Sequence, residues 1–235
     1  MSPAVKILIW VNVAAFVVKL LVPSIVLLLG LQPSAVLGRL WLWQPVTYLF
    51  LHHDFFHILF NMLGIWMFGV ELERLWGTKF FVKYYFVTGI GAAVTTILVG
   101  LLPFAFAAQV YYSITIGASG ALYGLLLAYA YYYPDRPILM FLLFPIPAKY
   151  FVMIIGAISL LSSMGGQGGV AHAAHLGGLL VGFIYLKSGG RGYLGKGGGL
   201  IAELKYRWVK WKMNRLRRKF DVYSGGRGPW DRTIH

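Results

Sequence analysis

The stretch GASGALYGLLLAYAYYY, residues 117–133, has no charged side chain and predicts a short membrane-spanning helix. Gly120, Gly124 and Ala128 recur every four residues along it, which gives the helix one smooth face. Ser119 stands where a loop becomes this helix, beside free backbone N–H groups and the positive end of the helix dipole. Those groups suit a developing oxyanion, although a plain N-cap is the commoner role for serine there.

A second stretch with the same spacing lies near the end of the apolar part of the chain. Small residues recur every four positions in AHAAHLGGLLVG, residues 171–182, at Ala174, Gly178 and Gly182. Two smooth faces let helices cross closely, and Ser119 and His175 flank these faces. Because a base takes a hydroxyl proton only at hydrogen-bond distance, the crossing would make Ser119 and His175 a candidate catalytic pair. Generic small-residue packing beside a hydrogen-bonded histidine is the competing interpretation.

The composition extends this membrane interpretation to most of the chain. Of 235 residues, 59% are hydrophobic and 12% are charged, whereas a soluble domain carries about 25% charged residues. Apolar runs predict an all-α membrane protein with six spans, at about Val5–Leu29, Phe55–Val70, Phe81–Leu102, Gly117–Tyr133, Lys149–Ser163 and Val170–Leu186. The proline-rich segment Pro134–Pro147 is expected to be an interfacial turn, and residues 32–53 and 103–116 are expected to be loops.

Basic residues predict the orientation and divide the chain in two. Residues 187–235 hold 13 of the 21 Lys and Arg, after a transmembrane domain at 1–187. We expect a tail at 188–235 with a Gly-rich linker and an amphipathic helix at 200–220, lying on anionic lipid rather than on nucleic acid. The positive-inside rule places both termini in the cytoplasm. Lys19 lies within the first span, where it either snorkels or faces a polar gap.

Polar side chains inside apolar runs are few, and they are functional candidates by default. They are His57, Asn61, Ser119 and His175, with His172 close by. No Asp or Glu lies well inside a predicted span, which disfavours proton-coupled transport and intramembrane aspartyl proteolysis. The chain has no cysteine, which excludes thiol catalysis and iron–sulfur ligation.

His57 and Asn61 are four residues apart, so they share one helix face. Both side chains could donate hydrogen bonds to an oxyanion, and an interhelical hydrogen-bonded pair is an equally good interpretation. Tyr123 lies one helical turn after Ser119 and could pack on the imidazole of His175.

A metal site is the remaining alternative for the histidines. The candidate ligands are His52, His53, His57, His172 and His175. No carboxylate or thiolate lies near His172 and His175 in the sequence, so we expect neither a metal nor a cofactor.

Taken together, these residues resemble the rhomboid family of intramembrane serine proteases. The family's Gly-x-Ser-Gly motif matches Gly117-Ala118-Ser119-Gly120, and its Ala-His-x-x-Gly-x-x-x-Gly motif matches Ala174-His175 with Gly178 and Gly182. The second-helix pattern His-x-x-x-Asn matches His57 and Asn61, and Glu-x-x-x-Gly matches Glu73 and Gly77. One departure is Trp43-Gln44, where many members have Trp-Arg in the first loop. These motifs cover about residues 40–185.

The resemblance implies a six-helix fold and a Ser119–His175 dyad without an aspartate. It implies that Tyr123 packs against His175, and that the Ser119 backbone, His57 and Asn61 form the oxyanion hole. The implied reaction is hydrolysis of peptide bonds in transmembrane segments of other proteins, at a site open to the outside of what we expect to be a prokaryotic cell membrane.

Two other functions compete with this one. The first is a catalytically inactive relative that binds membrane clients, although such proteins usually lose the serine or the histidine, and this chain keeps both. The second is a transporter or channel, which the missing carboxylates disfavour. The sequence does not predict an oligomeric state.

Overall fold

The computed structural model describes residues 2–140, 143–164, 169–188, 208 and 211–212. Contacts divide the chain into two units, Met1–Leu186 and Lys187–His235, and the candidate site lies within the first. The expected Gly-rich linker and most of the expected amphipathic tail helix lie outside the described residues.

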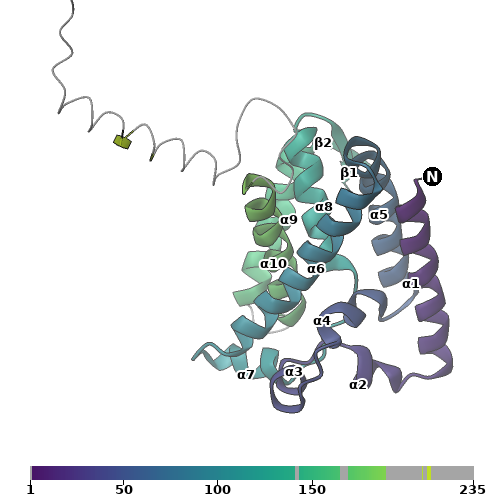
Figure 1. Cartoon of the computed structure of the whole chain (residues 1–235), viewed down its shortest axis with the longest axis vertical. Coiled ribbons are helices and arrows are strands. Elements are labelled where there is room, and N and C mark those ends of the chain that lie inside the picture. The colour runs from purple at the N-terminus through teal and green to yellow at the C-terminus, as the bar shows by residue number, and fades with distance from the viewer. Residues whose placement is uncertain (1, 141–142, 165–168, 189–207, 209–210, 213–235) are drawn as a thin grey trace, which may run out of the picture. The chain divides into compact units, whose positions relative to one another are not determined.

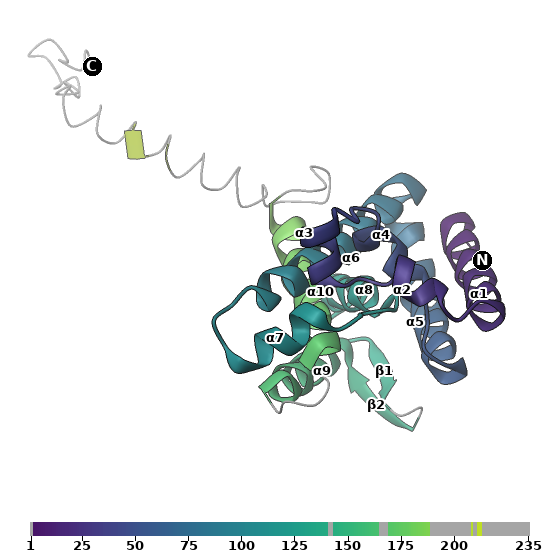
Figure 2. The same cartoon turned by 90° about the horizontal axis from the view of Figure 1, so that it is seen from below.

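The first unit is mostly helical (Figures 1 and 2). Its helices are α1 (Pro3–Leu21), α2 (Ile25–Leu29), α3 (Pro33–Arg39), α4 (Gln44–Thr47), the 3-10 turn η1 (Tyr48–Phe50), α5 (Phe55–Trp76), α6 (Thr78–Gly100), α7 (Ala105–Tyr112), α8 (Ser119–Tyr132), α9 (Ala148–Met164) and α10 (Gly169–Lys187). Strands β1 (Pro137–Met140) and β2 (Phe144–Pro147) form an antiparallel hairpin. Among the described residues, α1, α5 and α6 are long and apolar enough to cross a membrane.

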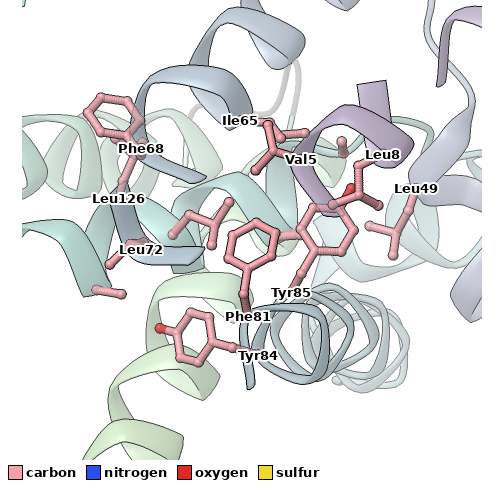
Figure 3. Packing of buried hydrophobic residues seen from close by; sticks show 14 of the residues in the cluster. Val5, Leu8, Leu49, Ile65, Phe68, Leu72, Phe81, Tyr84, Tyr85 and Leu126 are labelled. Carbon is pink, nitrogen blue, oxygen red and sulfur yellow. The ribbon is translucent and has the colours of Figure 1, made fainter. Parts of the chain in front are cut away.

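The short helix α8 lies in the middle of the bundle, where it contacts α5, α6 and α9 (Figure 2). Its residues Gly120, Ala121 and Leu125 are all buried. Buried side chains of α1, α5 and α6 form the core beside it, with Val5, Ile65, Phe81 and Tyr85 in contact around α5 (Figure 3). Many large apolar side chains face outward instead, including Trp10 and Trp66, as expected for a surface that meets lipid. The expectation of a mostly helical membrane protein is confirmed.

The expected first span, Val5–Leu29, is wrong as a single helix. Helix α1 ends at Leu21, and α2 begins only at Ile25. Pro23 cannot continue the hydrogen bonding of a helix and disfavours helical backbone at the residue before it. Val22 accordingly has φ −131° and ψ 78°, outside the helical region.

Three segments expected to lack regular structure contain some. The expected turn Pro134–Pro147 is the β1–β2 hairpin, in which Pro137 pairs with Pro147 across the strands. Prolines are tolerated in a two-stranded hairpin because each strand has an edge that needs no N–H partner. The expected loop 32–53 contains α3, α4 and η1, and the expected loop 103–116 contains α7.

Helix α5 runs six residues beyond its expected end at Val70, so Glu71 and Glu73 lie near the C-terminal end of a helix and not in the loop after it. The Glu73 carboxylate is buried and accepts hydrogen bonds from the backbone N–H groups of Ala4 and Val5, each at 3.0 Å. The hydroxyl of Thr78 donates to it as well, at 2.7 Å. A carboxylate at the start of α1 satisfies N–H groups that have no partner within that helix and complements its dipole.

Candidate active site

Ser119 and His175 lie within hydrogen-bond distance across the helix crossing. The Oγ of Ser119 is 2.8 Å from Nε2 of His175, and both side chains are half-buried. The N-cap of α8 is Ala118, so Ser119 is the first helical residue and its hydroxyl does not cap the helix. The plain N-cap interpretation therefore does not describe Ser119, and its hydroxyl is available to the histidine.

Tyr123 holds the imidazole of His175 in a face-to-face stack. The ring centroids are 4.1 Å apart and the planes differ by 7°. The Tyr123 hydroxyl is itself 3.2 Å from Oγ of Ser159 on α9. Among the described residues, Nδ1 of His175 has no hydrogen-bond partner, so the stacked Tyr123 ring is the contact seen on this imidazole besides Ser119 and His172.

The crossing of α8 and α10 depends on small residues at two levels. A Cβ on Gly178 would overlap the carbonyl oxygen of Gly120, and a Cβ on Gly182 would lie 3.3 Å from Cα of Gly124. Ala174 is buried one turn before Gly178 and contributes its carbonyl to the same contact. The structure thus brings together the two small-residue faces proposed from the sequence. Gly124 also packs against Thr88 of α6, a contact that the four-residue spacing does not predict.

Gly117 lies between His57 and Ser119. Its φ of 127° is in the region that favours glycine, and its backbone N–H donates to the Tyr48 carbonyl at 2.9 Å. A Cβ at this position would lie 2.8 Å from Nε2 of His57 and 3.7 Å from Oγ of Ser119. His57 Nε2 and the serine hydroxyl therefore both lie close to residue 117, where a side chain would clash with the imidazole.

Asn61 is buried below His57 on the same face of α5, but its side chain turns back to its own helix. Its Nδ2 donates to the carbonyl of His57 at 2.8 Å, and its Oδ1 has no partner among the described residues. One hydrogen of the amide nitrogen stays available, since the group carries two. His57 is therefore the better placed of the two candidate donors.

The turn before α5 fixes the orientation of His57. Asp54 caps the helix by accepting the backbone N–H of His57 at 2.9 Å, and this bond lowers the pKa of the Asp54 carboxyl. The backbone N–H of His53 donates to Nδ1 of His57 at 3.2 Å, and Lys19 Nζ donates to the His53 carbonyl at 2.7 Å. Burial lowers the pKa of His52 to about 4, and its neutral ring packs edge-on against His57.

No three His, Cys, Asp or Glu side chains are grouped to hold a metal within the part of the chain that the structure describes. The rings of His172 and His175 pack edge to face, 5.8 Å apart.

Gln44, at the position where the first-loop motif has arginine, is buried and bonded within the loop. Its Oε1 accepts the Gln32 backbone N–H at 3.0 Å, and its Nε2 donates to the Leu28 carbonyl at 3.3 Å. The indole of Trp43 donates to the same carbonyl at 2.9 Å. A neutral side chain with a donor and an acceptor thus connects the two sides of this loop.

A family model and several known proteins match this sequence. The family model described as the Rhomboid domain matches residues 39–191. Similar proteins include "Rhomboid protein 1, mitochondrial" of Saccharomyces cerevisiae, 31% identical over 58% of this chain and 38% of that protein. "Rhomboid protease AarA" of Providencia stuartii is 30% identical over 60% of this chain and 53% of its own length. "Rhomboid protease GluP" of Bacillus subtilis is 25% identical over 66% of this chain and 27% of its own. The chain therefore matches about half or less of the length of these relatives.

Proposed function

Because the chain belongs to the rhomboid family, we propose that it is an intramembrane serine endopeptidase that cleaves transmembrane segments of other proteins. The observation that carries the proposal is the 2.8 Å contact between Ser119 Oγ and His175 Nε2, with the imidazole stacked on Tyr123. A nucleophile, a base and a group that orients the base are the parts that covalent catalysis by serine needs.

In the first step, Ser119 Oγ attacks the scissile carbonyl carbon while His175 Nε2 takes the hydroxyl proton. The carbonyl oxygen becomes an anion, which costs free energy in an apolar site unless fixed donors face it. The backbone N–H of Ser119, at the start of α8, is one donor. Nε2 of His57 is a second, since it lies beside Gly117 and close to the serine hydroxyl.

In the following steps, the proton on His175 goes to the leaving amine nitrogen as the peptide C–N bond breaks. The carbonyl carbon stays bonded to Ser119 as an ester. His175 then takes a proton from water, the resulting hydroxide attacks the ester, and the proton returns to Ser119 Oγ. The second product leaves as a carboxylic acid.

Water must reach Ser119 for the ester to be hydrolysed, and the length of α8 favours this. Its 14 residues rise about 21 Å, less than the roughly 30 Å hydrocarbon core of a bilayer. A helix this short leaves its first residue below the membrane surface, where a cavity open to water can reach it. Ser119 is accordingly half-buried and not fully enclosed.

We extend the proposal to six spans, α1, α5, α6, α8, α9 and α10, with both termini in the cytoplasm. Lys and Arg residues support this orientation, because Lys6, Arg74, Arg136 and Lys149 belong to one side and Arg39 to the other. The site would then open to the outside, and the basic tail 188–235 would lie on anionic lipid. The partners are transmembrane proteins and lipid, not nucleic acid. The compact core suits a prokaryotic cell membrane, although one relative is named mitochondrial.

The test combines active-site labelling with cleavage by the purified full chain in detergent. A serine-reactive fluorophosphonate should label the wild type, and Ser119→Ala should abolish both labelling and cleavage of a single-pass membrane protein. His175→Ala should abolish cleavage too, and the double variant should be no worse, because dyad members act as one unit.

The controls separate a protease from an inactive, client-binding relative. Ser113→Ala removes a hydroxyl from the loop before α8 and should leave labelling unchanged. Binding of the membrane substrate without labelling of the wild type would indicate a client-binding protein. Substantial cleavage by Ser119→Ala would end the serine protease proposal, as would a loss of activity in EDTA that Zn²⁺ restores.

A further inference from the structure

We infer that Lys19 is a positioning residue for His57: it holds the His53 turn so that Nε2 of His57 keeps its proton and aims it at the oxyanion. The inference rests on the proposed function and adds a residue from α1, outside the motifs that carry the family resemblance. It also gives a role to a charge placed within the first apolar span, which would otherwise be costly there.

Three successive contacts connect Lys19 to the candidate active site. Lys19 Nζ, in the last turn of α1, donates to the His53 carbonyl at 2.7 Å, across 34 residues of sequence. The backbone N–H of His53 donates to Nδ1 of His57 at 3.2 Å. Nε2 of His57 then lies beside Gly117, on the side where Oγ of Ser119 is also near. This series of contacts begins at the ammonium group of Lys19 on α1 and ends at the imidazole of His57, near the Ser119 hydroxyl.

The middle link decides the tautomer of His57. A neutral imidazole has one N–H, and a ring nitrogen that accepts a hydrogen bond cannot carry that hydrogen. Since Nδ1 accepts from His53, the hydrogen is on Nε2, the nitrogen that faces the site. The other tautomer would direct a lone pair at the developing negative charge and repel it.

The two histidines of the site therefore need opposite tautomers. Nε2 of His175 must be free of hydrogen to accept the Ser119 proton, whereas Nε2 of His57 must carry one to donate. His175 is held by stacking on Tyr123. His57 is instead held through a backbone N–H, so its tautomer depends on how firmly residue 53 is fixed.

Residue 53 needs an external contact because it lies in an exposed turn. His53 and Asp54 are both exposed, and Asp54 fixes the start of α5 without fixing the carbonyl of His53. The ammonium of Lys19 supplies a charge-assisted hydrogen bond to that carbonyl, which is roughly twice as strong as a neutral one. Holding the carbonyl restricts rotation of the same residue's backbone, and hence the direction of its N–H.

Lys19→Met tests the inference, since it keeps an unbranched apolar side chain on a lipid-exposed helix and removes the charge. We expect kcat to fall about tenfold with KM unchanged, less than the 10²–10³ typical for loss of an oxyanion donor. Lys19→Arg should restore most of the rate, because a guanidinium also donates to a carbonyl. Lys6→Met, an exposed lysine near the other end of α1, is the matched control and should keep full activity. Thermal unfolding of all three variants should match the wild type.

Two further measurements separate positioning from a general structural role. In the His57→Ala background, Lys19→Met should cause no additional loss, because the group that it positions is gone. ¹⁵N NMR of labelled histidine, with His57 assigned by its alanine variant, should show hydrogen on Nε2 in the wild type and a mixture of tautomers in Lys19→Met.

The outcomes distinguish this inference from the proposed function. An active wild type with unchanged kcat in Lys19→Met would overturn the role of Lys19 alone, as would an equal loss in the His57→Ala background. A wild type that neither cleaves nor reacts with fluorophosphonate would overturn the protease proposal. The NMR result would still test whether Lys19 controls the His57 tautomer.

Discussion

The two ends of α1 make different polar contacts, one with the end of α5 and the other with the turn before α5. At the start of α1, the buried carboxylate of Glu73 accepts hydrogen bonds from Ala4 and Val5 and from the Thr78 hydroxyl. At the end of α1, Lys19 makes one hydrogen bond to the His53 carbonyl in an exposed turn. We call the end at Glu73 the closed end, because its hydrogen bonds are buried and several. We call the end at Lys19 the open end, because its one hydrogen bond is made in an exposed turn, which in turn contacts His57.

Under the proposed function, this difference separates stability from catalysis in the bundle. The Glu73 carboxylate is buried and accepts three hydrogen bonds, so that end fixes how α1 and α5 are placed. Near the Ser119 end, Oδ1 of Asn61 and Nδ1 of His175 are buried without a partner among the described residues. Unpaired buried groups cost stability, and they are expected where a site must bind substrate or water. Variants at the two ends should therefore affect different quantities.

The largest effect is expected from Gly178→Leu, which tests whether the site near the open end depends on the close crossing of α8 and α10. A side chain there would overlap the Gly120 carbonyl, which is backbone and cannot move aside. The helices would separate, and with them Ser119 and His175, so we expect loss of both thermal stability and turnover. Gly38→Ala is the control, since a Cβ at Gly38 has no neighbour within 4 Å. Normal stability and turnover in Gly178→Leu would mean that these faces do not meet in the protein.

The next effect concerns the donors at the open end. His57→Ala should lower kcat by about 10²–10³, with a smaller effect on KM, and leave thermal unfolding nearly unchanged. Asn61→Ala should lower kcat less, because one of its amide hydrogens is already bonded to the His57 carbonyl. Both should keep fluorophosphonate labelling of Ser119 at a reduced rate. If either variant unfolds while its folded fraction turns over normally, that residue is a structural hydrogen-bonding group.

At the closed end, Glu73→Ala should lower the free energy of unfolding and leave kcat unchanged. It leaves the N–H groups of Ala4 and Val5 without their acceptor, which costs about 1–3 kcal/mol for a buried group. Thermal unfolding in detergent should show the loss, and kcat of the folded fraction should equal that of the wild type. A drop in kcat without a change in stability would remove the distinction between the two ends.

The smallest effect is expected at the exposed pair of Arg136 and Glu71, close to Glu73 in sequence. Both side chains are partly solvent-exposed, at 49% and 38%, and pairs that solvent reaches contribute about 0–1 kcal/mol. Arg136→Gln and Glu71→Ala should each change the unfolding temperature by far less than Glu73→Ala does. An equal loss from Glu71→Ala would show that burial is not what makes Glu73 important.

Sequence reasoning succeeded where the signal was local. The starts of α5, α8 and α9 fall within two residues of their predicted positions, because Asp54, Gly117 and Pro147 stand just before them and are typical of helix starts and turns. Proximity of Ser119 and His175 followed from two four-residue repeats, each readable on its own helix. Errors arose where one residue changed the local backbone, as at Pro23, and where prolines formed a hairpin.

The sequence by itself determined that the chain is a helical membrane protein, which few polar residues enter its apolar runs, and that two helices can cross closely. Only the tertiary structure decided that Glu73 caps α1 and that Lys19 reaches His53. The physical reason is that helix formation and apolar periodicity depend on neighbours within a few residues. The rotation and height of one helix against another depend instead on packing across the whole bundle, and these set which atoms of Lys19, His53 and His57 come within hydrogen-bond distance.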